Sequence, residues 1–221
     1  DEEAGTAWDG PVVVLTSAYS ASASEIFAGA LQDYQRALVV GASATHGKGT
    51  VQELLDMRPL LARFGGSSER DAGALKYTSS QFYRITGKST QRVGVVPDLI
   101  LPSPFDGLDS REGDLKTALP YDEIASARFR PVGEVTWDLA ALKASSAARV
   151  KASKGFGMMA ELRELREAKD GKPTSLELSI RQAERDEWNA LEEKADAAGL
   201  DGESDIVLDE AIAVSVDFVG G

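Results

Sequence analysis

Three serines alternate with alanines at Ser20, Ser22 and Ser24, a few residues after a short apolar run, 11–16. A serine hydroxyl becomes a useful nucleophile only when a base removes its proton. A lysine can be that base when burial lowers its pKa, because the neutral amine takes the proton. Lys48 stands between two glycines, with no acidic residue within four positions on either side. These residue types indicate a serine–lysine pair, a known variant of the serine hydrolase arrangement.

Gln52 is the candidate for orienting that lysine. If residues 48–52 are extended, Lys48, Thr50 and Gln52 point to one face, because the strand period is two. An amide can hold the lysine by a hydrogen bond without adding charge, whereas a carboxylate would keep the lysine protonated. The serines also open an expected helix, whose unpaired N–H groups favour developing negative charge.

The same residues allow structural interpretations. Ser22 and Glu25 have the spacing of a capping box, the ordinary way to begin a helix, and the local pattern alone favours it. That pattern leaves all three serines open as the nucleophile. His46 is more typical of a loop or surface position than of a base. Gly49 occupies the Ser/Thr position of a phosphate loop, so that motif is not satisfied.

Composition narrows the classes of function. The chain has 221 residues and a formal net charge of −12, which disfavours nucleic acid and anionic membrane surfaces as partners. It has no cysteine and one histidine, which excludes disulfides, thiolate zinc sites and multi-histidine metal sites. No apolar run approaches the ~18 residues of a membrane span. The chain begins at Asp1 without a methionine, and we expect a processed protein or a piece of a longer one.

The first half has the pattern of an α/β domain. The β-branched run at 11–16, an amphipathic helix at 22–36 and a strand at 37–41 predict a βαβ unit with a parallel strand pair. A strand at 50–55, a turn at 65–68 and strands at 75–78 and 81–85 predict a long antiparallel hairpin. A further short strand is expected within 95–101.

The second half has a helical pattern. Helices are expected at 137–151, 156–169, 175–198 and 205–218. Three parts follow from this pattern: an α/β half at 1–104, a connecting segment at 105–136 and a mainly α-helical domain at 137–221. The many acidic side chains of these helices are most simply explained as helix faces exposed to solvent.

Several of these segments together resemble a known family. They are Ser20 to Ala30, Leu38 to Gly41, Gly47 to Gln52, Lys76 to Thr78, Phe82 to Arg84, Gly87 to Asp98 and Ala118 to Asp122. The first six resemble the catalytic core of the carboxyl-terminal processing (tail-specific) proteases, which are serine peptidases with a Ser-Lys dyad often completed by Gln. The last, with the helical tail, resembles the bacterial periplasmic Prc branch. The resemblance implies a ClpP/crotonase-like catalytic fold.

The resemblance also assigns roles to individual residues. It implies Ser22 as the nucleophile, Lys48 as the general base, Gln52 as the residue that orients the base, and the Ala23 N–H as an oxyanion donor. It implies an endopeptidase that acts on unfolded or tail-exposed proteins in the periplasm or cell envelope. The resemblance implies an enzyme without a metal or nucleotide cofactor and an adaptor lipoprotein as a partner.

The family's PDZ domain, its N-terminal helical part and its second oxyanion glycine would all precede residue 1. We therefore expect this chain to be the C-terminal half of such a protease, with little or no activity alone. The main alternative is a non-catalytic, partner-binding or scaffold member of the same fold. Acyl-CoA chemistry on a related fold is a further alternative, which the lack of a nucleotide or CoA signature disfavours.

Overall fold

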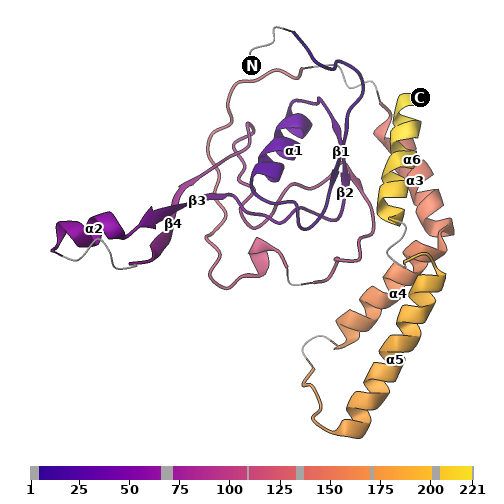
Figure 1. Cartoon of the computed structure of the whole chain (residues 1–221). Helices are drawn as coiled ribbons and strands as arrows, with labels where there is room; N and C mark the ends of the chain where they lie inside the picture. Colours follow the sequence, from indigo (N-terminus) through magenta and orange to yellow (C-terminus); the bar gives the residue numbers. More distant parts are fainter. Residues whose placement is uncertain are drawn as a thin grey trace.

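The computed structural model describes residues 5–65, 72–108, 110–132, 137–169, 172–200 and 205–220 (Figure 1). Most of the turn expected at 65–68 lies outside these ranges. The strands are β1 (Val13–Thr16), β2 (Leu38–Gly41), β3 (Thr50–Asp56), β4 (Ala74–Gln81) and β5 (Leu99–Ile100). The helices are α1 (Ala23–Asp33), α2 (Arg58–Arg63), the 3-10 turn η1 (Glu112–Asp114), α3 (Leu139–Ala152), α4 (Lys154–Lys169), α5 (Leu178–Ala197) and α6 (Ile206–Gly220).

The central sheet is parallel, with strand order β1-β2-β5. β1 pairs with β2 from Val13 opposite Leu38 onward, and α1 makes the crossover, so the expected βαβ unit is confirmed. β2 is buried along its whole length, as a strand covered on both faces should be. β5 is shorter than the expected 95–101, because the Asp98 carboxylate accepts the Val39 N–H at 2.9 Å just before the ladder begins.

The second sheet is the antiparallel hairpin of β3 and β4, which projects from the body of the protein (Figure 1). The sequence predicted two strands, 75–78 and 81–85, whereas β4 is one strand from Ala74 to Gln81. The pairing register shifts near the expected break, because Val51 lies opposite Ser80 and Gln52 lies opposite Thr78. The strand expected at 81–85 does not form beyond Gln81, where only an isolated antiparallel bridge, Tyr83 opposite Ser89, remains. The chain then turns, and the Gly87 N–H donates to the Arg84 carbonyl. Arg84 also forms a paired hydrogen bond with Asp33 on α1, which draws this turn onto the helix. α2 was not predicted.

The helical region packs onto the sheet. α1 lies on one face and α3 and α6 lie on the other (Figure 1). Leu142 of α3 and Val214 of α6 join Leu38, Val40, Leu99 and Leu101 in one buried cluster. The Arg149 guanidinium of α3 forms ion pairs with two carboxylates of α6, those of Glu210 at 2.9 Å and Asp217 at 2.7 Å. The sheet therefore depends on α3 and α6 to cover one of its faces.

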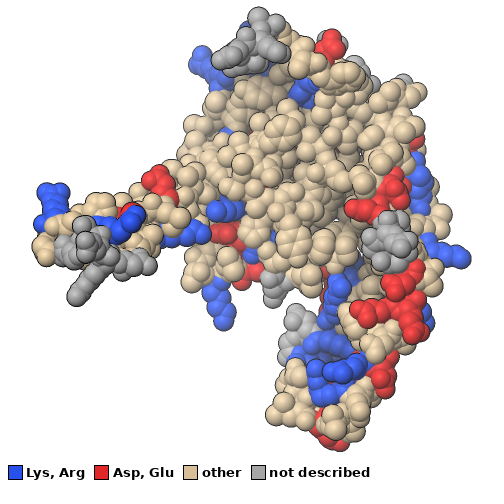
Figure 2. Space-filling view, viewed as in Figure 1, with Lys and Arg blue, Asp and Glu red and all other residues tan. Residues whose placement is uncertain are grey.

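α4 and α5 form a hairpin that extends away from the sheet (Figure 1). Charged side chains gather over these helices in Figure 2, whereas the face of the body in that view is mostly uncharged. This agrees with solvated helix faces. Among the helices that the structure describes, none is long and apolar enough to cross a membrane.

The shared core predicts how stability responds to truncation. Leu142→Ala should lower the free energy of unfolding by about 2–5 kcal/mol, because it opens a cavity between α3 and the sheet. Leu176→Ala is the control, since that side chain is 97% exposed, and it should change stability by less than about 0.5 kcal/mol. Urea unfolding followed by circular dichroism measures both. Equal effects of the two variants would contradict the shared core.

Candidate active site

Ser22 occupies the corner between β1 and α1. Its backbone has φ 57° and ψ −112°, in the left-handed half of φ space that non-glycine residues rarely adopt. Such conformations persist where the surrounding structure enforces them, and they cluster at functional sites. Ser22 is the N-cap of α1 and forms the expected capping box with Glu25, whose carboxylate accepts the Ser22 N–H at 2.8 Å. Ala23 is the first helical residue, so its N–H has no acceptor within the helix.

The neighbouring serines have other surroundings. The Ser20 hydroxyl accepts the Ser17 N–H at 3.1 Å, and the Ser20 N–H donates to the Ser17 carbonyl at 3.0 Å. Ser20 therefore closes the turn that follows β1. Ser24 lies in the first turn of α1 and is exposed. Of the three serines, Ser22 alone combines a strained backbone with a position at the helix N-cap.

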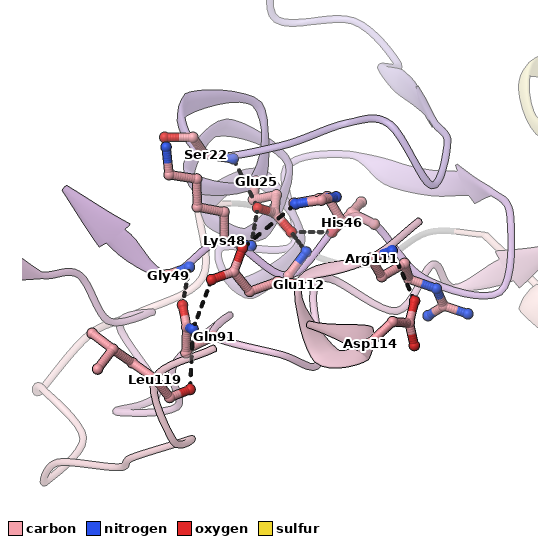
Figure 3. Close-up of polar contacts among 12 residues, drawn as sticks. Ser22, Glu25, His46, Lys48, Gly49, Gln91, Arg111, Glu112, Asp114 and Leu119 are labelled. Atoms are coloured by element: carbon pink, nitrogen blue, oxygen red, sulfur yellow. Dashed lines mark hydrogen bonds and ion pairs between the residues drawn. The ribbon is translucent and has the colours of Figure 1, made fainter. Parts of the chain in front are cut away.

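The Glu25 carboxylate connects this corner to the lysine segment. Its side chain is fully buried. One carboxylate oxygen accepts the N–H groups of Ser22 at 2.8 Å and Lys48 at 2.9 Å. The other accepts the Thr45 hydroxyl and the Gly47 N–H, both at 2.6 Å (Figure 3). The sequence assigned Glu25 only the capping role, and the structure shows that the same carboxylate also holds the loop that carries Lys48.

Within residues 42–49, which we call the lysine loop, every backbone N–H from Thr45 to Gly49 has a hydrogen-bond acceptor. The five N–H groups from Thr45 to Gly49 donate in turn to the Val95 carbonyl, the Ser20 carbonyl, Glu25, Glu25 and Gln91. The flanking glycines permit this close packing. A Cβ on Gly47, at φ +92°, would lie 2.9 Å from the Arg92 backbone, and one on Gly49 would lie 2.6 Å from the Gln91 nitrogen.

Lys48 is partly buried, and its side chain points toward Ser22 (Figure 3). It forms no ion pair with a carboxylate of the described residues. Gln52 is exposed on β3, opposite Thr78. Within the described part of the chain, no hydrogen bond links the side chains of Ser22, Lys48 and Gln52, and the orienting role of Gln52 stays a prediction.

Two buried or partly buried residues behind the lysine loop were not found from the sequence. Gln91 is fully buried and accepts the Gly49 N–H at 2.9 Å. Glu112 lies 3.6 Å from the His46 ring nitrogen, and its N–H donates to the His46 carbonyl at 2.9 Å. His46 thus has a bonding role in the loop. Only the Gly47-Lys48-Gly49 spacing could have hinted at such neighbours, because it indicates close backbone contact.

The chain matches two known families in succession. Residues 1–101 match peptidase family S41, and residues 105–206 match the C-terminal domain of tail-specific protease. The tail-specific protease of Haemophilus influenzae is 34% identical over 99% of this chain, which corresponds to 34% of that protein. The carboxy-terminal-processing protease of Bartonella bacilliformis is 37% identical over 47% of this chain and 22% of its own length. This chain therefore spans about a third of the length of the Haemophilus influenzae protein.

The bonds of Glu25 predict a sharp effect of an almost isosteric substitution. Glu25→Gln should lower the free energy of unfolding by about 2–5 kcal/mol, because the amide NH2 faces N–H donors and leaves buried groups unpaired. Hydrogen exchange of the Gly47 and Lys48 amides should accelerate at the same time. Calorimetry and exchange measured by NMR test both effects.

Glu53→Gln provides the matched control. Glu53 is exposed on β3, where it accepts the Tyr77 hydroxyl at 3.0 Å, so its substitution should leave stability within about 0.5 kcal/mol. Unchanged exchange of the Lys48 amide in Glu25→Gln would show that this carboxylate does not hold the lysine loop.

Proposed function

Because this chain belongs to the tail-specific proteases of peptidase family S41, we propose that it carries the nucleophile and the general base of a serine endopeptidase, Ser22 and Lys48. The observation that carries the proposal is the Glu25 carboxylate, one oxygen of which accepts the backbone N–H of both residues. This contact brings together two segments 26 positions apart in the sequence (from 22 to 48). Their side chains then face one another at the corner where α1 begins (Figure 3).

The chemistry follows from this arrangement. The neutral Lys48 amine takes the Ser22 proton as the hydroxyl oxygen attacks the scissile carbonyl carbon. The tetrahedral oxyanion lies at the helix N-terminus, where the Ala23 N–H can donate to it. Collapse expels the amine product, to which protonated Lys48 gives its proton, and leaves an acyl group on Ser22. Water, deprotonated by Lys48, then releases the acid product. Gln52 orients the amine.

The finer features of the family belong to the same proposal. The catalytic half would have a ClpP/crotonase-like fold, and the substrates would be unfolded proteins or proteins with exposed apolar C-terminal tails. The setting would be the periplasm or cell envelope, with an adaptor lipoprotein as partner. The name of the Haemophilus influenzae relative, tail-specific protease, supports this substrate class.

A non-catalytic, partner-binding role is the second candidate. It is favoured by the apolar side chains on the projecting hairpin, where Leu54 is 73% and Phe64 is 80% exposed. Isolated surface apolar residues are ordinary, but several on one projecting arm indicate a contact surface. Cleavage by the wild-type protein that is lost on substituting the dyad would exclude the non-catalytic role.

Substitution of the dyad tests the proposed function. In the full-length protein that carries this chain, Ser22→Ala and Lys48→Arg should each lower kcat/KM on an unfolded reporter at least about 10³-fold. Arginine keeps the charge but cannot act as a base, because it stays protonated. Ser24→Ala, on the exposed neighbouring serine, should cleave at the wild-type rate. Undiminished cleavage by either dyad variant would refute the assignment.

The 221 residues alone should cleave the same reporter at least about 10²-fold more slowly than the full-length protein. The chain corresponds to 34% of the length of the Haemophilus influenzae protein, and the second oxyanion glycine is expected to precede residue 1. Removal of one oxyanion donor typically lowers kcat about 10²–10³-fold. Fluorogenic peptide assays at equal concentrations measure the ratio. Equal turnover numbers would show that this chain holds a complete active site.

A further inference from the structure

Residues 110–119, which we call the strap, run behind the lysine loop. The sequence predicted a connecting segment here. The structure places the strap against the loop, where the Glu112 N–H donates to the His46 carbonyl at 2.9 Å and the Arg111 guanidinium donates to the Ser43 hydroxyl at 3.0 Å. The strap thus contacts residues of the lysine loop that precede Lys48 in the sequence (Figure 3).

Gln91 extends this contact to the residue that follows Lys48. Its side chain is fully buried and makes three hydrogen bonds. The side-chain oxygen accepts the Gly49 N–H at 2.9 Å, so it holds the peptide bond between Lys48 and Gly49. The side-chain nitrogen donates to the Glu112 carboxylate at 3.2 Å and to the Leu119 carbonyl at 3.1 Å. Gln91 therefore links the lysine peptide directly to both ends of the strap.

We propose that the strap is a positioning element of the active site, which acts on Lys48 through Gln91 and Glu112. The proposal rests on the proposed function, in which Lys48 is the base. Glu25 fixes the backbone on the N-terminal side of Lys48, and Gln91 fixes it on the C-terminal side. Neither residue touches the reacting atoms in this account. Each sets where the lysine backbone lies.

The glycines explain why both sides must be held. Gly47 and Gly49 add little intrinsic restraint, since glycine accepts a wide range of backbone angles. Without the Gln91 bond, the peptide after Lys48 can rotate, and the amine at the end of the long side chain moves with it. A base must lie about 2.6–3.2 Å from the proton it takes. A displacement of about 1 Å can cost 10²-fold in rate.

The strap also changes how the two matched regions are divided. Lys48 and Gln91 lie in the region that matches peptidase family S41, whereas Glu112 and Leu119 lie in the region that matches the C-terminal domain of tail-specific protease. The two regions meet at the peptide that carries the base. The C-terminal region therefore contributes a part of the catalytic apparatus in addition to covering the sheet.

Kinetics of the full-length protein test the proposal. Gln91→Ala should lower kcat at least about 10-fold and change KM less than about 3-fold, because it displaces the base without removing substrate contacts. Gln32→Ala is the matched control. Gln32 also makes three side-chain hydrogen bonds, to Val96, Asp98 and Arg84, but none to the lysine loop. It should leave kcat within about 2-fold.

A swap of the two partners provides a rescue. Gln91→Glu still accepts the Gly49 N–H but places a carboxylate against Glu112, so kcat should fall. Adding Glu112→Gln restores a donor between the two side chains and should recover at least about 5-fold in kcat. A purely structural role would not give this pattern, provided that thermal melts show all variants folded. Wild-type kcat in Gln91→Ala, or a swap slower than Gln91→Glu, would overturn the proposal.

An exchange measurement separates this proposal from the assignment of the dyad. In the 221-residue chain, Gln91→Ala should speed hydrogen exchange of the Gly49 amide at least about 10-fold relative to Gln32→Ala, whatever the chain catalyses. Unchanged exchange would overturn the strap's hold on the loop. If Ser22→Ala retains cleavage, the proposed function fails instead. If Ser22→Ala abolishes cleavage while Gln91→Ala keeps full kcat, the dyad stands and the strap proposal fails.

Discussion

The buried carboxylate of Glu25 is the interaction on which the rest of the site depends. A fully buried carboxylate is costly unless donors surround it, and here it accepts three backbone N–H groups and one hydroxyl. Those donors come from two segments that are distant in the sequence. The helix start and the lysine loop are therefore obliged to meet, because separating them would leave the carboxylate or its donors unpaired.

The remaining structure supports this contact from outside. The parallel sheet places the ends of β1 and β2 side by side, so the turn before α1 and the start of the lysine loop leave the same edge. α3 and α6 cover one face of that sheet and α1 covers the other (Figure 1). Behind the loop, Gln91 and the strap complete the set of backbone bonds. A flexible lysine between two glycines thus acquires a defined position.

Local patterns were enough to predict much of this fold and part of the site. The alternation and helical periodicity around residues 11–41 depend on near neighbours, and the βαβ unit followed from them. Lys48 could be proposed from its uncharged glycine loop, which is a local feature, whereas Ser22 was chosen from three serines only through the family resemblance. The split of β4 and the omission of α2 show the limit, since these depend on how the hairpin pairs and turns.

The partners of the lysine loop could not be derived in the same way. Gly49 and Gln91 are 42 positions apart, and nothing near either residue specifies the other. Glu25 illustrates the difference within one side chain. Its bond to the Ser22 N–H lies three residues away and was predicted as a cap, whereas its bonds to Gly47 and Lys48 arise only when the sheet brings the loop to the helix.

The most direct test of the central claim is to trap the acyl-enzyme. The full-length protein would be mixed with an activated ester of a short apolar peptide, quenched in acid and digested, and the acylated residue would be identified by mass spectrometry. Acylation of Ser22 in the wild-type protein, and its loss in Lys48→Arg, is the result that this account predicts. Acylation of Ser20 or Ser24, or undiminished acylation of Ser22 without Lys48, would contradict it.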